Sequence, residues 1–291
     1  DAGVRYLVID NLDDAERISR LAAAPVPVLL RVSPSVRAST HEAMQTGQED
    51  SKFGIPPDQV EAVIAQLRSE PLIDLRGLHA HIGSQLSDLE QFRSEVAALA
   101  EFERFDVYDL GGGLGVRYVD SDVAAPVDAY AEALVSEVHR RLGHDVELLV
   151  EPGRSMIARS VVTVYRATTV KRGRRTHLAV DGGMGDNLEV SLYGQGFTPA
   201  VIDREGPTEI VDVVGRHCES GDFIANDVPV VAPRVGDLVV VPVTGAYCFT
   251  MANNYNTALK PPVVFCDSGQ ARLAVRRQEF SELLDRELLL P

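Results

Sequence analysis

Three short glycine-containing segments of this chain have the composition of loops that bind phosphate. The central one, Asp109-Leu110-Gly111-Gly112-Gly113-Leu114-Gly115, follows a short apolar run and carries three consecutive glycines. His81-Ile82-Gly83-Ser84-Gln85 precedes it, and Glu151-Pro152-Gly153-Arg154-Ser155 follows it. Backbone without Cβ can approach a ligand closely and present a row of N–H groups, as phosphate-binding loops do. One glycine cluster alone is more often a turn, but three such segments in order favour a site for one phosphorylated cofactor.

Each segment comes at the end of a predicted β-strand, and the first half of the chain alternates strands with helices. Strands are predicted over 4–10, 27–32, 77–81, 105–110 and 146–150, and helices over 11–23, 57–69, 88–102 and 127–142. Each connection is long enough for a right-handed crossover between parallel strands. Five such strands are compatible with an open parallel sheet or with part of a barrel whose rim carries the three segments.

The pattern changes at about Ser160, where short β-rich runs are separated by Gly, Asp and Pro. Strands are predicted over 161–165, 176–180, 211–214, 238–243, 262–265 and 271–277, and a helix over 281–289. Runs of strands without intervening helices indicate a second domain that is mainly an antiparallel β-sheet.

Composition narrows the class of protein. The 291 residues are 45% hydrophobic and carry a net charge of −15, so we expect neither nucleic acid nor an anionic membrane as a partner. No apolar run has the length of a spanning helix, and the first residues lack the features of a signal peptide. The three cysteines, Cys218, Cys248 and Cys266, do not make a disulfide framework, and no metal site is expected. A cytoplasmic enzyme fits these features.

Seven motifs together resemble those of diaminopimelate decarboxylase and its relatives, the pyridoxal-phosphate-dependent amino-acid decarboxylases with an alanine-racemase-type barrel. Besides the three glycine segments, they are Ser51-Lys52-Phe53-Gly54-Ile55, Cys218-Glu219-Ser220-Gly221-Asp222, Gly245-Ala246-Tyr247 and Asn253-Asn254-Tyr255-Asn256. The motifs occur in the family's order over essentially the whole chain. The resemblance implies a (β/α)8 cofactor-binding barrel, represented here by its last five units over residues 1–158, and a C-terminal β-domain over 159–291.

The resemblance also implies how pyridoxal 5'-phosphate would be held. His81 would stack on the pyridine ring, and Glu151 would pair with the pyridine nitrogen, which makes the ring a strong electron acceptor. Arg154 would bind the phosphate or the substrate carboxylate through its fork of donors. The remaining implied contacts are Ser84 and the amides of Gly111, Gly112 and Gly113 at the phosphate, and Tyr247 beside the cofactor.

For the β-domain, the resemblance implies a catalytic cysteine and two further substrate contacts. Cys218 resembles the family's proton donor to the carbon that loses CO2, a role that a thiol titrating near neutral pH can fill. Glu219 resembles a contact to the substrate amine, and Tyr193 a contact to the substrate. In relatives the Cys-Glu segment enters the active site of the other subunit, so an obligate homodimer is implied. Cys248 and Cys266 carry no motif and are expected in the core.

One expected residue has no match. The family's Schiff-base lysine lies on the first barrel strand in an Ala-x-Lys-Ala-Asn context, whereas this chain has only Lys52, Lys171 and Lys260, all in other contexts. The strand predicted at 4–10 aligns with the fourth of the eight strands. Five strands cannot close a barrel and would expose two apolar edges. We therefore expect the sequence to be the C-terminal part of a longer chain, poorly active by itself, with a naturally shortened protein as the alternative.

A second departure concerns the substrate. Relatives place an arginine that grips the distal carboxylate in the segment Asn-Pro-Arg-Pro-Ala-Leu-Tyr, and Glu189 occupies its position here. A carboxylate at this position would repel the distal carboxylate of diaminopimelate, and Glu189 is therefore a predicted substrate-facing residue. Arg216 and His217 replace a usual Pro and an apolar residue before Cys218, and Arg216 is a candidate for restoring the lost positive charge.

Three functions remain open from the sequence. The main prediction is decarboxylation of an amino acid of the diaminopimelate, lysine or ornithine type, with a variant substrate such as a carrier-protein-bound amino acid and weak activity on meso-diaminopimelate. The second is diaminopimelate decarboxylase proper, making L-lysine, with Arg154 or Arg216 binding the carboxylate. The third is a non-catalytic relative that dimerises with an active paralogue, although such a protein would not need Cys218, Glu219 and Glu151.

Overall fold

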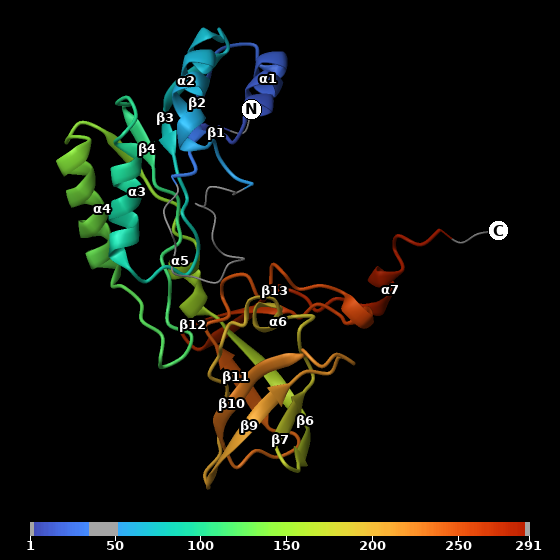
Figure 1. The fold of residues 1–291 in the computed structure, drawn as a ribbon. Helices are drawn as coiled ribbons and strands as arrows, with labels where there is room; N and C mark the ends of the chain where they lie inside the picture. Colours follow the sequence, from blue (N-terminus) through green and yellow to red (C-terminus); the bar gives the residue numbers. More distant parts are fainter. Residues whose placement is uncertain (1–2, 35–51, 289–291) are drawn as a thin grey trace. The chain divides into compact units, whose positions relative to one another are not determined.

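The computed structural model describes residues 3–34 and 52–288, which fold as two compact units (Figure 1). The first unit contains the described residues up to Arg117 together with Asp122–Met156. The second contains Tyr118–Ser121 and the described residues from Ile157 onward. The first unit is α/β and the second is mainly β, as the sequence pattern predicts.

The first unit is a parallel five-stranded sheet in the order β1-β2-β3-β4-β5. Its strands are β1 (Leu7–Ile9), β2 (Val26–Arg31), β3 (Ile73–His79), β4 (Val107–Asp109) and β5 (Glu147–Leu149). Its helices are α1 (Leu12–Leu21), α2 (Val60–Ser69) with the 3-10 turn η2 (Pro57–Gln59) before it, α3 (Leu89–Leu99), α4 (Val127–Arg141) and α5 (Arg154–Ile157). The order of strands equals their order in the chain, so each helix returns the chain to the same end of the sheet.

Local signals explain where these helices begin and which face they bury. The side chain of Asn11 accepts a hydrogen bond from the Asp14 amide and caps α1, and Asp88 caps α3 in the same way. The buried residues of α2 follow the i, i+3, i+4, i+7 spacing of one helix face: Val60, Val63, Ile64 and Leu67. These faces cover the sheet and form the core from which the strand ends emerge.

The two edge strands of this sheet approach each other at their amino ends. The Arg5 guanidinium, just before β1, donates a hydrogen bond of 2.8 Å to Glu147 at the start of β5, and the Tyr6 hydroxyl donates to the same carboxylate at 3.1 Å. No β-pairing joins β1 to β5 in the part of the chain that the structure describes. The sheet therefore curves as a barrel wall does, while Leu7 and Val8 of β1 stay about two-fifths exposed, at 41% and 40%.

The second unit contains a six-stranded sheet in the order β10-β9-β7-β6-β11-β8 and a separate hairpin, β12-β13. Neighbours are antiparallel except β7 and β9, which are parallel. The strands are β6 (Val162–Arg172), β7 (Thr176–Val180), β8 (Ala200–Val201), β9 (Thr208–Val214), β10 (Phe223–Val231), β11 (Leu238–Pro242), β12 (Val263–Asp267) and β13 (Gln270–Val275). The helical elements are α6 (Glu189–Tyr193), α7 (Phe280–Leu283) and the 3-10 turns η3 (Ala158–Ser160) and η4 (Tyr255–Thr257).

Strand β10 is the largest element that the sequence pattern does not predict. It is an edge strand, where Pro229 is tolerated because its missing N–H need not pair. The pairing of β10 with β9 is irregular around Asp227, which has a positive φ of 51°. Proline, aspartate and this irregularity interrupt the apolar alternation by which a strand is recognised. The helix predicted over 281–289 is also shorter, since α7 ends at Leu283 and residue 289 lies outside the described range.

No helix among the described residues has the length and apolarity that crossing a bilayer requires. The cytoplasmic location stays a prediction.

Candidate active site

The carboxyl ends of three neighbouring strands bring the glycine segments together in the first unit. The backbone links them directly: the Ala80 amide donates to the Asp109 carbonyl at 2.9 Å, and the Glu151 amide donates to the Gly111 carbonyl at 2.6 Å. Because β3, β4 and β5 are parallel, the loops that follow them share one edge of the sheet. The three segments singled out in the sequence thus form one rim.

The glycines are required by the close approach of these loops. A Cβ on Gly111 would lie 2.6 Å from the Ala80 carbonyl oxygen, one on Gly112 2.4 Å from that of Glu151, and one on Gly113 2.3 Å from that of Gly83. Gly111 and Gly113 also have positive φ angles of 56° and 105°. The loop after β4 therefore exposes backbone without Cβ atoms between the loops that follow β3 and β5. Such exposed backbone is the kind of surface that binds a phosphate group.

His81 lies against this loop in its neutral form. Its Nδ1 accepts a hydrogen bond of 3.0 Å from the Gly112 amide, so the ring proton is on Nε2. Burial lowers the pKa of His81, and the positive charge of Arg31 lowers it further. A neutral, flat imidazole held by the loop suits the predicted stacking on a pyridine ring.

Two of the three loop amides already donate within the protein. The Gly111 amide donates to the Asp109 side chain at 2.9 Å, and the Gly112 amide donates to His81. These two hydrogen bonds could not be predicted from the sequence, because they depend on how the side chains of Asp109 and His81 are oriented within the rim. The phosphate contact of these amides stays a prediction, and binding through the Gly112 amide would require it to leave His81.

Arg154 and Ser84 come together as the sequence predicts. Arg154 begins α5 and is buried, and its Nη2 donates to the Ser84 hydroxyl at 3.4 Å. A buried guanidinium beside a hydroxyl is a strong site for an anion, because charge-assisted hydrogen bonds gain strength away from water. This pair beside the bare-backbone loop fits a phosphate group.

Glu151 belongs to a cluster of three polar side chains. One side-chain atom of each of His79, Asp109 and Glu151 lies within 4.8 Å of the others, and His79 Nε2 is 3.6 Å from the Glu151 carboxylate. The nearby His79 lowers the pKa of Glu151 despite the partial burial of this carboxylate. Half of the Glu151 side chain is exposed (51%), whereas His79 and Asp109 are buried. No individual role was predicted for His79 or Asp109, although a polar residue that ends an apolar strand is a signal for both.

Buried polar groups extend this cluster inward. Glu95 of α3 is fully buried, and neither of its carboxylate oxygens has a hydrogen-bond partner among the described residues. Burial raises the pKa of Glu95 well above its usual range, and its interaction with the nearby Asp109 carboxyl group adds to the effect. Burial also raises the pKa of Tyr130 to about 12, with Glu95 and Asp109 contributing. Glu95 is therefore a proton-carrying group beneath the rim.

We expect Glu95→Gln to stabilise the protein at pH 8 and to change its stability little at pH 4. A carboxyl whose folded-state pKa is raised binds a proton on folding, so it favours the folded state below its unfolded pKa and loses this contribution as pH rises. Glutamine has the same shape and no titration. Each unit of pKa shift corresponds to about 1.4 kcal/mol, or roughly 2–4 °C in Tm for a domain of this size. Thermal melts at both pH values measure the difference, and an equal shift at both would contradict the neutral Glu95.

In the second unit, Cys218 and Glu219 lie in the loop between β9 and β10. The buried Asp222 fixes this loop: its carboxylate accepts from the His217 amide at 2.7 Å and from the Met184 amide at 2.6 Å. The Cys218 thiol is exposed, and Glu219 accepts a hydrogen bond from the Tyr255 hydroxyl. Asp222 therefore holds the loop in place, and the loop exposes the Cys218 thiol to solvent.

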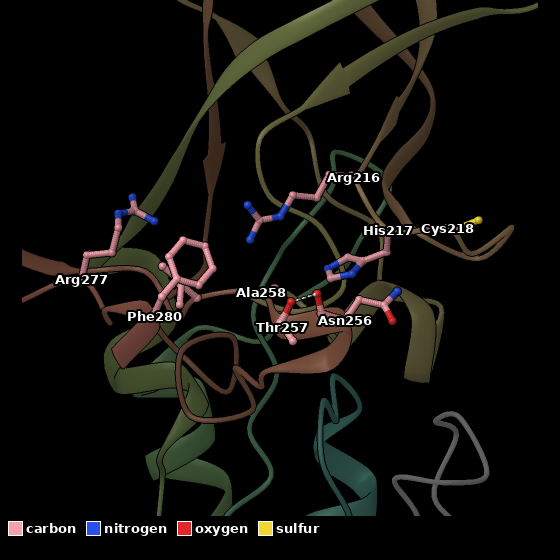
Figure 2. Close-up of a pocket in the computed structure, with 9 residues that line it drawn as sticks. Arg216, His217, Cys218, Asn256, Thr257, Ala258, Arg277 and Phe280 are labelled. Atoms are coloured by element: carbon pink, nitrogen blue, oxygen red, sulfur yellow. Dashed lines mark hydrogen bonds between the residues drawn. The ribbon is translucent and has the colours of Figure 1, made fainter. Parts of the chain in front are cut away.

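A pocket of about 610 Å³ lies beside this loop (Figure 2). Its lining residues are Arg216, His217, Cys218, Asn256, Thr257, Ala258, Leu259, Arg277 and Phe280. Two arginines and no acidic residue line it, and Figure 2 shows the Cys218 sulfur pointing away from Arg216 and His217. Such a pocket attracts an anionic group.

The remaining predicted site residues differ in exposure. Tyr247 is 44% exposed and has a positive φ of 64°, a backbone conformation that costs energy in a residue with Cβ and is common at functional positions. Tyr193 ends α6 and is half-buried. Glu189 is buried, with 1% of its surface exposed, which argues against the predicted contact with substrate.

The other two cysteines behave differently from each other. Cys248 is buried, with its sulfur 3.5 Å from the Asn187 side-chain oxygen, and belongs to the core as predicted. The same prediction is wrong for Cys266, which is exposed on β12, because the short hairpin β12-β13 leaves most of its residues in solvent. Ser51, which begins the first of the seven motifs along the chain, lies outside the described residues.

Comparisons with known proteins agree with this geometry. Residues 1–158 match the family model of the pyridoxal-dependent decarboxylase, pyridoxal binding domain. A diaminopimelate decarboxylase of Actinosynnema pretiosum subsp. auranticum is 43% identical over 98% of this chain and 68% of its own length. One from Synechocystis sp. is 37% identical over 97% of this chain and 64% of its own length. The crystal structure of diaminopimelate decarboxylase from M. jannaschii in complex with L-lysine covers 100% of this chain and 70% of that one, with a TM-score of 0.91 and 25% identity.

The chain thus spans about two thirds of the length of these relatives. The rim fits the cofactor that the family model names: bare backbone and the Arg154–Ser84 pair for a phosphate, a neutral imidazole for the ring, and a half-exposed carboxylate for the pyridine nitrogen. Pyridoxal phosphate is the cofactor that this family match indicates for the chain.

Proposed function

From the premise that the chain belongs to the diaminopimelate decarboxylase family of pyridoxal-phosphate-dependent carboxy-lyases, we propose that the protein decarboxylates diaminopimelate. The observation that carries this choice of substrate is the pocket beside Cys218, which two arginines and no carboxylate line. A substrate with a second carboxylate at its far end suits this charge. Lysine and ornithine, whose far ends are cationic, do not.

Each site residue then has a defined task. When bound, pyridoxal phosphate supplies a ring that accepts the electron pair of the breaking bond between Cα and the carboxylate. Arg154 and Ser84 would hold the phosphate, and Glu151 would pair with the pyridine nitrogen. His81 would cover the ring and exclude water. Cys218 would supply its thiol proton to Cα in place of the carboxylate that leaves as CO2.

We further infer that two copies of the chain form a dimer in which Cys218 and Glu219 serve the partner's site. The exposed thiol on a loop that Asp222 fixes supports this arrangement, because a proton donor must be accessible to the reacting carbon.

A variant substrate is the second candidate, because Glu189 occupies the position of the family's arginine. A lysine, an ornithine or a carrier-protein-bound amino acid would avoid repulsion by this carboxylate. The burial of Glu189 weakens that argument, since a carboxylate without exposed surface is poorly placed to select a substrate.

The substrate assay separates the two candidates. We expect kcat/KM for meso-diaminopimelate to exceed that for lysine or ornithine by about thirtyfold or more, since the loss of one charged contact costs roughly 2–5 kcal/mol. Arg216→Met should lower the value for diaminopimelate and leave the values for the other amino acids almost unchanged. The matched control is Arg174→Met, which changes an exposed arginine between β6 and β7. Comparable turnover of lysine or ornithine would favour the variant substrate.

A further inference from the structure

The Glu151 carboxylate lies in front of two buried polar groups that the proposed function does not use. His79 ends β3 and Asp109 ends β4, and both are less than a tenth exposed. Their side-chain atoms lie within 4.8 Å of each other and of Glu151. The charged and titratable groups that face this cluster come from four more places: Arg31 of β2, His81 after β3, Glu95 of α3 and Tyr130 of α4.

The carboxyl groups of Glu151 and Asp109 lie within 4.8 Å of each other, and Asp109 interacts electrostatically with the buried Glu95, so the three carboxyl groups cannot all be ionised. Like charges at this separation repel, and burial makes each anion costly, so protons must remain on some of them. Glu151 is the most exposed of the three and has His79 Nε2 beside it, which makes it the carboxylate that ionises most easily. Asp109 and Glu95 are buried and are the groups that keep their protons.

The hydrogen bonds at Asp109 agree with a neutral carboxylic acid. Its Oδ1 accepts from the Gly111 amide at 2.9 Å, and its carboxyl group also pairs with that of Glu151. Two carboxyl oxygens can share a hydrogen bond only if one carries a proton. Burial raises the pKa of Asp109, and the negative charge of Glu151 raises it further, whereas the donors around Glu151 lower the pKa of Glu151.

His79 completes the arrangement from the other side. Its Nδ1 is buried and has no hydrogen-bond partner among the described residues. Because a buried N–H without a partner costs more than a bare lone pair, the Nδ1 position disfavours a proton. Nε2 lies on the other side of the ring, and its N–H points to the Glu151 carboxylate 3.6 Å away.

We propose that Asp109 is a positioning residue which, as a neutral acid, donates its O–H to Glu151 and, together with the N–H of His79, holds the Glu151 carboxylate ionised for the pyridine nitrogen of the cofactor. This inference rests on the role proposed for Glu151 but not on the identity of the amino-acid substrate. A carboxylate with two fixed donors keeps its charge and its orientation, so it pairs with a protonated ring nitrogen over a wide pH range.

Two substitutions at Asp109 test the proposal through cofactor binding rather than activity. Asp109→Asn retains the shape, an acceptor for the Gly111 amide and a donor to Glu151, so affinity for pyridoxal phosphate should stay within about threefold of the native value. Asp109→Leu has similar size and no donor, so affinity should fall at least tenfold, as the loss of a hydrogen bond to a charged group implies. Absorbance titration of the full protein with pyridoxal phosphate measures both.

The pH dependence of the affinity for pyridoxal phosphate distinguishes a positioning role of Asp109 from a purely structural one. Without the Asp109 donor the pKa of Glu151 rises, so the affinity of Asp109→Leu relative to the native protein should fall further from pH 8 to pH 6. A structural defect would give the same ratio at both pH values and would overturn the proposal. Asp106→Leu, at an exposed carboxylate three residues earlier, is the matched control. If Asp109→Leu does not fold, Asp109→Asn tests the proposal by itself. A tenfold or larger loss of affinity for pyridoxal phosphate in this variant would mean that Asp109 acts as an anion, and would overturn the proposal. If diaminopimelate proves not to be the substrate, all of these cofactor affinities should stay the same.

Discussion

Replacement of Cys218 by alanine is expected to lower the turnover number of decarboxylation by about 10²–10⁴-fold, the usual contribution of a positioned acid. Affinity for pyridoxal phosphate should stay within about twofold, because the thiol is proposed to serve the proton transfer and not the binding of the cofactor. The thiol is exposed, and the loop that carries it is fixed through Asp222. Steady-state rates with saturating cofactor and substrate measure the effect.

Cys266 supplies the matched control. It is the other exposed cysteine of the described residues and lies on β12, outside the loop that Asp222 fixes. Cys266→Ala removes the same thiol from an exposed position and should leave the turnover number unchanged. Equal losses in the two variants would point to a general effect of thiol removal. A Cys218→Ala variant with native turnover would show that another group protonates Cα.

The same substitution also tests the proposed sharing of active sites. Cys218→Ala removes the proton donor and Glu151→Gln removes the partner of the pyridine nitrogen, so each variant alone should be nearly inactive. When the two variants are dissociated and reassociated together, half of the dimers are mixed, and one site in each mixed dimer has both native residues if Cys218 serves the partner subunit. About one quarter of the native activity should return. No recovery would indicate that Cys218 serves the site of its own subunit.

The sequence predicts the rim of this site because the rim depends on the ends of strands. His81, the glycine loop and Glu151 each follow an apolar run, and parallel strands place their carboxyl ends together, so these residues meet without knowledge of any side-chain contact. The pairing of Arg154 with Ser84 follows for the same reason. Neighbouring loops of one sheet edge are within reach of each other whatever the exact packing.

The groups behind the rim could not be predicted in this way. His79 and Asp109 read as polar residues at the ends of strands, and nothing in their spacing shows that both turn toward Glu151. Glu95 shares the buried face of α3 with Phe92 and Leu99, and its complete burial depends on how α3 packs against α4. In β10, Pro229 and Asp227 conceal a strand whose pairing is set by its edge position. These features depend on tertiary packing, which the local sequence pattern does not reveal.

The second large effect is expected for Gly112→Ala, which should weaken the binding of pyridoxal phosphate roughly ten- to hundredfold. The new Cβ would lie 2.4 Å from the carbonyl oxygen of Glu151, a backbone atom that cannot rotate away. Relief requires the loops after β4 and β5 to separate, which disturbs the 2.6 Å hydrogen bond between Glu151 and Gly111 and the contact of Gly112 with His81. Overpacking of this kind costs about 1–3 kcal/mol, and each 1.4 kcal/mol is about tenfold in affinity.

Gly173→Ala tests whether the effect of Gly112→Ala comes from this contact. Gly173 lies between β6 and β7, has no positive φ, and a Cβ there would meet only the Arg175 carbonyl oxygen at 3.8 Å, an ordinary contact. This variant should bind the cofactor as the native protein does and melt at the same temperature. Gly112→Ala should melt several degrees lower even without cofactor, since the clash lies within the backbone of the rim. Native cofactor affinity in Gly112→Ala would mean that the loops after β4 and β5 can separate freely. The rim would then not be a rigid binding site for the phosphate.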